Sequence, residues 1–114
     1  MATLTQEQAR RALDAGLAKA AEIGSPSSIA IVDAGRNLLA FARMDGALLA
    51  SIEISQNKAF TARSMNMKTG DIGPLTQPGQ PLVVDGEIAG AVGVAGGLVP
   101  QDEEVAAAAA ASLA

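Results

Sequence analysis

The sequence contains no Cys, His, Trp or Tyr, and its only aromatic residues are Phe41 and Phe60. The chain therefore lacks the thiol and imidazole groups that hold zinc, ligate haem or form Ser-His-Asp and Cys-His catalytic sets. We predict no metal site. Any chemistry must come from carboxylates, Lys, Arg, hydroxyls, amides, Met and the backbone.

Positive charge is also scarce, with eight Lys and Arg against twelve Asp and Glu and a net charge of -4. The basic residues are scattered along the chain, so we expect no nucleic-acid partner. No segment approaches the roughly 20 apolar residues that cross a bilayer, and the first residues lack the apolar core of a secretory signal. We therefore expect no membrane partner and a cytoplasmic location.

The length of 114 residues predicts a single domain spanning 1–114. Apolar residues make up 49% of the chain and are mostly Ala, Val, Ile and Leu. A core of such small side chains must fit closely, because gaps in a close-packed interior are destabilising.

Helical periodicity and capping signals predict three helices. Thr5 to Gln8 fit a capping box before the first helix, and Gly24 suits its C-terminal end. A second helix is expected from about Ser51 to Met65, and an Ala-rich third helix opens at Pro100 with acidic residues in its first turn.

Two β-hairpins are predicted between these helices. The first joins strands at 28–32 and 37–44, and the second joins 81–84 to 87–95 through Asp85-Gly86. Residues 66–80 are rich in Gly and Pro and read as a long loop. The order is α-β-β-α-β-β-α, an α/β fold of the α+β kind.

The apolar residues of the second helix are spread around its axis. Ile52, Ala59 and Ala62 share one side, Ile54 and Met65 lie on another, and Phe60 lies on a third. Helices of this kind tend to be buried on several sides, so we expect packing against the sheet and against a neighbouring subunit.

Several separate motifs resemble the GlcG/HbpS family. The segments are SIAIVDAGRNLLAFARMDGA, SIEISQNKAFTA, DGEIAGAVGVAGG and QDEEVA, which follow one another in order over most of the chain. The resemblance implies an antiparallel sheet flanked by helices in a profilin-like or PAS-like arrangement. It also implies assembly into a homo-oligomer, dimeric or larger, and a tetrapyrrole such as haem as a ligand.

The chain departs from the family pattern in two places. The segment between the second helix and the last hairpin is shorter than usual. Relatives commonly read Gly-Val-Ser-Gly-Gly, often followed by Thr, whereas this chain has Ala95 in place of the Ser and Leu98 in place of the Thr. With no His, Cys or Tyr, a haem ligand would have to be Met, Lys or a carboxylate.

Arg43 and Asp45 flank the turn that ends the first hairpin and are candidate ligand-binding residues. The guanidinium fork of Arg43 could clamp a ligand carboxylate. Alternatively, Arg43 pairs with Asp45 or Asp33 and only secures the hairpin.

Lys58 and Arg63 emerge beside the apolar surface of the second helix. A desolvated Lys58 could act as a base or as a Schiff-base amine, with Glu53 as a second proton-transfer group and Arg63 as a further ligand contact. Alternatively, both cations extend along the surface into water or a subunit interface. Asp102 to Glu104 have a sufficient structural role at a helix N-terminus, although one of them buried in a pocket could serve as a general acid or base.

Three functional hypotheses follow. The first is an oligomeric protein that binds a tetrapyrrole or a small organic metabolite in a pocket between the sheet and the second helix, closed by the 66–80 loop. The second is a cofactor-independent lyase or isomerase acting on a small carboxylated metabolite. The third is a structural partner in a catabolic assembly, which predicts no pocket.

Overall fold

The computed structural model describes residues 3–66 and 79–113. Within them the elements follow the order α1 Gln6–Glu22, β1 Ser28–Asp33, β2 Leu38–Arg43, α2 Ser51–Met65, β3 Gly79–Val84, β4 Glu87–Ala95 and α3 Val99–Ala111. The predicted order of helices and strands is confirmed. Gly79 and Gln80, which were expected in the loop, begin β3, and residues 67–78 lie outside the described part.

The local signals act as the sequence predicts. The Thr5 hydroxyl accepts a hydrogen bond from the Gln8 backbone at 3.1 Å, and the Gln8 side chain accepts one from the Thr5 backbone at 2.9 Å. Gly24 has a φ of 67°, in the left-handed region that glycine enters without penalty. Asp85 and Gly86 also have positive φ, as the tight turn between β3 and β4 requires.

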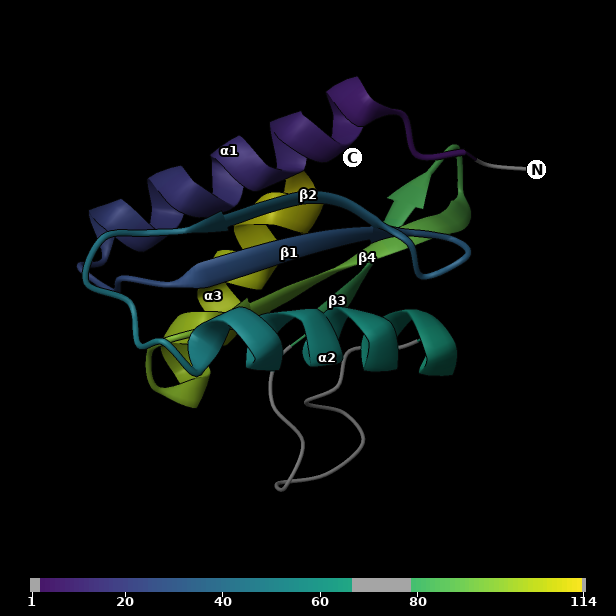
Figure 1. Ribbon diagram of the computed structural model, residues 1–114. Coiled ribbons are helices and arrows are strands. Elements are labelled where there is room, and N and C mark those ends of the chain that lie inside the picture. Colours follow the sequence, from purple (N-terminus) through teal and green to yellow (C-terminus); the bar gives the residue numbers. More distant parts are fainter. Residues whose placement is uncertain (1–2, 67–78, 114) are drawn as a thin grey trace.

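The four strands form one antiparallel sheet in the order β2-β1-β4-β3, so β1 and β4 are central. Helices α1 and α3 cover one face of the sheet and α2 covers the other (Figure 1). Ser28 of β1 pairs with Arg43 of β2 on one side and with Ala95 of β4 on the other. These three residues therefore lie at the same end of the sheet and on the same face.

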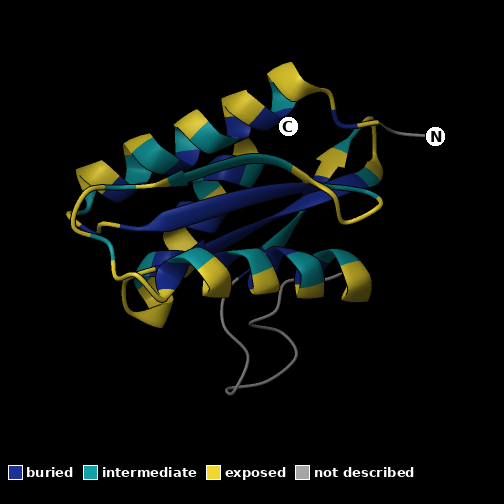
Figure 2. Ribbon diagram, in the orientation of Figure 1, coloured by how far each residue is buried: buried dark blue, intermediate teal, exposed yellow. Residues whose placement is uncertain are grey.

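The core has two layers, one on each face of the sheet (Figure 2). The larger layer lies under α1 and α3 and includes Ile29, Ile31, Val92, Val94 and Val105. The smaller layer lies under α2 and contains mainly small side chains, namely Ala30, Val32, Ala59, Ala62 and Ala91. The small side chains bring α2 close to the sheet.

Gly93 of β4 shows how close α2 lies. A Cβ atom at this position would lie 1.9 Å from the Ser55 backbone oxygen and 2.5 Å from the Ala59 backbone nitrogen. Real side-chain carbons do not approach main-chain atoms so closely, so only glycine allows this packing. The main chain of α2 therefore rests directly on the main chain of β4.

The expected packing of α2 against the sheet is confirmed, and within one chain α2 is buried on that side, while its packing against a neighbouring subunit stays a prediction. Its buried residues are Ser51, Ser55, Lys58, Ala59 and Ala62, all on the side that faces the sheet. Ile54 and Met65 are 36% and 52% exposed. The close approach to Gly93 leaves room for small side chains only at this contact. Phe60 packs partly buried against the layer under α2, whereas Ile54 and Met65 point outward. No helix in residues 3–66 and 79–113 is long and apolar enough to cross a membrane.

Candidate functional site

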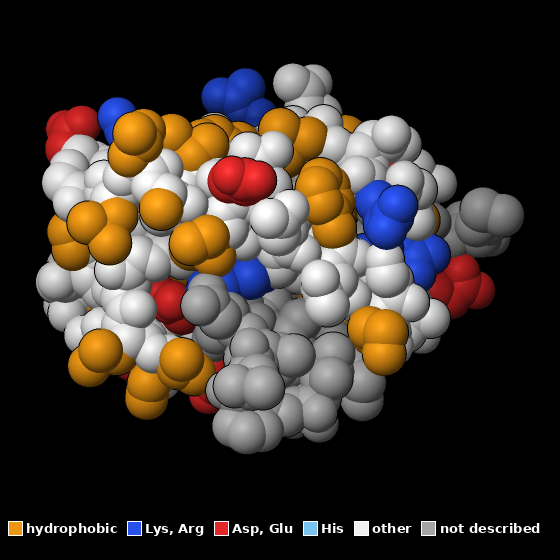
Figure 3. All heavy atoms as spheres, turned by 60° about the horizontal axis from the view of Figure 1, so that its bottom comes forward, with side chains coloured by type: hydrophobic (Ala, Val, Ile, Leu, Met, Phe, Trp, Pro, Cys, Tyr) orange, Lys and Arg blue, Asp and Glu red, His pale blue; other side chains and the backbone are white. Residues whose placement is uncertain are grey.

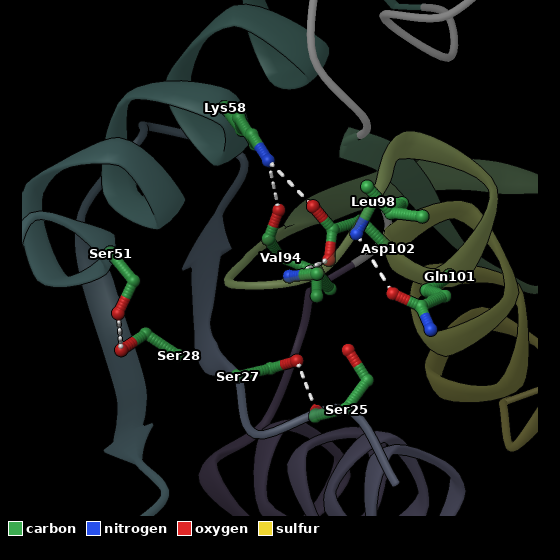
Figure 4. Close-up of polar contacts among 10 residues, drawn as sticks. Ser25, Ser27, Ser28, Ser51, Lys58, Val94, Leu98, Gln101 and Asp102 are labelled. Atoms are coloured by element: carbon green, nitrogen blue, oxygen red, sulfur yellow. Dashed lines mark hydrogen bonds and ion pairs between the residues drawn. The ribbon is translucent and has the colours of Figure 1, made fainter. Parts of the chain in front are cut away.

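Lys58 is the most unusual charged residue of the chain, because its side chain points inward from α2 and is only 5% exposed. Its Nζ donates a hydrogen bond to the Val94 carbonyl at the end of β4 and lies 3.3 Å from Oδ2 of Asp102 in α3 (Figure 4). One amine thus joins α2, β4 and α3. The alternative in which Lys58 extends into water is wrong, because the amine is held inside the fold.

Asp102 completes this buried ion pair with a side chain only 4% exposed. Its Oδ1 accepts a hydrogen bond from the Gly97 backbone at 3.0 Å, across the turn that leads from β4 into α3. The first turn of α3 also favours a carboxylate, because unpaired N–H groups and the helix dipole carry partial positive charge there. Both carboxylate oxygens are therefore held in place.

Two opposing effects act on Lys58. Burial lowers the pKa of its ammonium group below the ordinary value of 10.5, whereas the charge of Asp102 and the hydrogen bond to it act in the opposite direction. Burial has the larger effect because water is removed from around the charge. The amine is therefore easier to deprotonate than an exposed lysine.

Lys58 and Asp102 line a pocket of about 180 Å³, which lies where the N-terminal parts of α2 and α3 meet the C-terminal end of β4. Its polar wall includes Lys58, Asp102 and Ser51. The rest of the lining consists of apolar and backbone surface from Leu48, Ala50, Ile54, Ala95, Gly96, Gly97 and Val99. Figure 3, which shows the side that carries α2, has hydrophobic side chains in several separate groups on this face, with charged side chains between them.

The pocket differs from the expected one. It lies beside one end of α2 and not between the length of that helix and the sheet, where the close packing at Gly93 leaves no room. The loop that was expected to close it falls mostly on residues 67–78, outside the described part.

The other predicted site residues do not line this pocket. Glu53 is exposed on α2, Arg43 is exposed at the end of β2, and Asp45 is exposed after β2. The register places Arg43 at the same end and on the same face of the sheet as the pocket residue Ala95, two strands away. Arg43 can therefore meet only a ligand that extends beyond the pocket.

The expected pairing of Arg43 with Asp45 or Asp33 is not among the ion pairs of the described residues. Asp33 instead accepts hydrogen bonds from the Gly35 and Asn37 backbones, both at 2.9 Å, and so stabilises the β1–β2 turn by itself. Short acidic side chains commonly satisfy a turn in this way.

Arg63 has a structural position at the other end of α2. Its Nε donates to the Ala34 carbonyl at 2.8 Å, and its Nη1 donates to Asn66. These bonds tie the end of α2 to the β1–β2 turn. Arg63 therefore lies apart from Lys58, although the sequence grouped the two.

Sequence reasoning missed three polar features near the pocket. The sequence indicates a helix-terminus role or an acid–base role for Asp102 but does not identify it as the partner of Lys58, although a buried lysine needs a carboxylate partner. Ser51 shares a 2.7 Å hydrogen bond with Ser28 beneath α2. Ser25 is buried as well, and its hydroxyl has no partner among the described residues.

A sequence profile of the family described as "Haem degrading protein HbpS-like" matches residues 4–111. The chain belongs to the HbpS-like family. Protein GlcG of Escherichia coli (strain K12) is 40% identical to this HbpS-like chain over 107 residues, which cover 80% of each protein. The predicted resemblance to GlcG and HbpS is confirmed.

Solved structures of the family have the same fold. A double mutant of Streptomyces reticuli HbpS matches with a TM-score of 0.91 and 33% identity, over 100% of this chain and 89% of that one. A PduOC:Heme complex matches with a TM-score of 0.89 and 28% identity, over 97% of this chain and 95% of that one. The antiparallel α+β fold expected from the sequence is confirmed.

Haem, which is present in the PduOC complex, does not fit the described pocket of this HbpS-like chain. The pocket is smaller than the roughly 300 Å³ at which sites for drug-sized ligands begin. The sulfur of Met44 accepts a hydrogen bond from the Ser27 backbone, and Met65 is exposed away from the pocket. Met1 and Met67 lie outside the described residues, and Lys58 lines the pocket that is too small for haem.

Proposed function

We propose that this HbpS-like chain binds a small organic molecule in the pocket of Lys58 and Asp102. The observation that carries the proposal is a buried ion pair that lines a pocket. Buried charges are expensive unless they are paired, and a pair that also faces a pocket can exchange hydrogen bonds with a ligand.

The pocket chemistry supports a neutral ligand that carries an oxygen atom. Lys58 supplies N–H donors and Asp102 supplies acceptor oxygens, and the two formal charges cancel. A hydroxyl or carbonyl group can use either partner without bringing a charge into the site. The pocket volume of about 180 Å³ lies below the roughly 300 Å³ at which sites for drug-sized ligands begin, which favours a ligand of a few carbon atoms.

The apolar residues Leu48, Ile54 and Val99 offer surface to the carbon part of such a ligand. They are 69%, 36% and 47% exposed, so they lie at the outer part of the pocket, away from the buried ion pair. A short chain with one oxygen-bearing end matches this order of polar and apolar surface.

Binding can be tested by two-dimensional NMR with butanone and 2-butanol as neutral probes and butyrate as an anionic probe. We expect the neutral probes to shift the backbone signals of Gly96, Gly97 and Asp102, because these residues line the pocket. Ile54→Trp should fill the pocket and weaken binding by about tenfold or more, the equivalent of about 1.4 kcal/mol.

Met65→Trp is the matched control, because Met65 is an exposed residue of α2 that does not line the pocket. It should bind the probes as the unaltered chain does. If the neutral probes shift no pocket signal, or if both Trp variants bind equally well, the proposed pocket is not the binding site.

A second candidate function is a cofactor-independent lyase or isomerase that moves a proton with Lys58. The lowered pKa of Lys58 and the carboxylate at 3.3 Å favour it, because general bases work best when their pKa lies near the working pH. Glu53 is exposed outside the pocket, so Asp102 replaces it as the second proton-transfer group. Stronger binding of butyrate than of butanone would favour this carboxylate-directed alternative.

We also propose that the chain forms a homo-oligomer through the apolar surface around the pocket mouth. Leu48, Leu49 and Leu98 are 69%, 75% and 73% exposed, and Leu98 lies between the pocket residues Gly97 and Val99. Large apolar side chains gathered at one place commonly mark an interface. A second copy would cover this surface.

Light scattering should give a mass larger than that of one chain, and Leu49→Asp combined with Leu98→Asp should reduce it. Met65→Asp changes an exposed apolar residue elsewhere on α2 and should leave the mass unchanged. A single-chain mass for the unaltered protein at micromolar concentration would contradict the proposal.

A further inference from the structure

The chain has three lysines, and the structure separates two of them by environment. Lys19 lies on α1 beside Glu22 and Glu104, at 3.4 and 3.2 Å, and these carboxylates raise its pKa. Lys58 is buried and its pKa is lowered. Lys68 lies outside the described residues.

A lysine amine can react with a carbonyl carbon only when it has lost its proton, because the ammonium form has no free electron pair. The amine must also be within reach of the reactant. Lys58 meets both requirements. Burial lowers the pKa of its amine, and its side chain lines the pocket that a reactant can enter. Its neighbours Leu48 and Ile54 would contact the carbon chain of a bound carbonyl compound.

We propose that Lys58 forms a reversible imine with small aldehydes that enter this pocket. The inference rests on the proposed function, because the same pocket must first admit the molecule. Aldehydes suit the site because their carbonyl carbon has only one carbon substituent and can approach a recessed amine.

The reaction balances within the pocket. The electron pair of Nζ forms a bond to the carbonyl carbon while the carbonyl π pair moves to the oxygen, and a proton passes from nitrogen to oxygen to give a carbinolamine. The C–O bond then breaks as the nitrogen pair forms the C=N bond, and the departing hydroxyl takes up the second nitrogen proton and leaves as water. Addition of water reverses the sequence, and no oxidant or reductant is consumed.

Asp102 is placed to carry the protons in both steps. Its Oδ2 lies 3.3 Å from Nζ and can accept one nitrogen proton in each step and pass it to the oxygen, first to give the hydroxyl group and then to give water. The hydrogen bond from Gly97 to Oδ1 keeps this carboxylate in position during the exchange. Carboxylates held within hydrogen-bond reach are common general acids and bases.

Reductive trapping tests the inference on the intact protein. The chain is incubated with butanal and sodium cyanoborohydride at neutral pH, and peptide mass mapping locates each added butyl group. We expect Lys58 to be labelled faster than Lys19, because the lowered pKa of Lys58 leaves more free amine, whereas the carboxylates beside Lys19 keep it protonated. Ile54→Trp should slow labelling of Lys58, and Met65→Trp should not.

Variants of the chain distinguish failure of imine formation from failure of ligand binding. Lys58→Arg keeps a positive charge beside Asp102 but has no reactive amine, so it should lose the label at position 58 while labelling of Lys19 continues. Equal labelling of Lys58 and Lys19, or labelling unaffected by Ile54→Trp, would overturn the inference. If butanone and 2-butanol bind but Lys58 is not labelled, the proposed function stands and imine formation does not.

Discussion

Replacing Lys58 by Met is expected to lower the free energy of unfolding by about 3–5 kcal/mol, the usual effect of removing one partner of a buried ion pair. The loss arises mainly from Asp102, which is only 4% exposed and would be left as an unpaired charge. The Val94 carbonyl would also lose the donor that now satisfies it. Urea denaturation of the variant measures the change.

The double variant Lys58→Met with Asp102→Leu should recover most of this loss, because apolar replacement of a whole buried pair is often neutral or stabilising. Lys19→Met is the control, since its ion pairs are at the surface and should contribute little. If Lys58→Met were as stable as the unaltered chain, the buried pair described here would not exist in solution.

The same pair should give the protein a distinctive pH dependence. Because burial lowers the pKa of Lys58, the unfolded chain binds more protons than the folded chain between that lowered pKa and 10.5. The free energy of unfolding therefore rises with pH in this window, and the contribution of Lys58 to it stays constant at lower pH. Subtracting the free energy of unfolding of the Lys58→Met, Asp102→Leu double variant at each pH removes the opposite contribution of Lys19, whose pKa is raised. A difference that stays flat up to pH 10.5 would contradict this assignment.

Gly93→Ala is expected to destabilise the fold by about 3 kcal/mol or more. Overpacking usually costs about 1–3 kcal/mol, and here the new methyl group meets main-chain atoms that cannot rotate away. Its Cβ would lie 1.9 Å from the Ser55 oxygen. Helix α2 must shift, and because α2 carries Lys58, the variant should also lose probe binding in the NMR experiment.

Gly16→Ala provides the matched control. The nearest atom to its Cβ would be Ile29 Cδ1 at 3.0 Å, the end of a flexible side chain. Alanine is also about 1 kcal/mol more favourable than glycine inside a helix, which offsets a small rearrangement. We therefore expect a change close to zero, measured as the midpoint of urea denaturation. Equal effects of the two substitutions would show that the close contact between α2 and β4 is absent.

Much of the fold could be predicted because its signals are local. The capping box at Thr5 and the Asp85-Gly86 turn depend on residues only a few positions apart, and both form as expected. The outward position of Ile54 and Met65 could not be predicted in this way. It depends on Gly93, which lies in β4, far from both residues in the sequence. The close contact of α2 with Gly93 admits only small side chains at this point.

The sequence by itself determined the order of elements, the family and the chemistry that is absent, because each follows from composition or from short motifs. It also pointed to Lys58, through its place beside apolar residues. Only the tertiary structure decided that Asp102 is its partner and that Glu53, Arg43, Asp45 and Arg63 do not line the pocket. Lys58 and Asp102 are 44 positions apart, and their contact depends on how α2 and α3 pack around the end of β4.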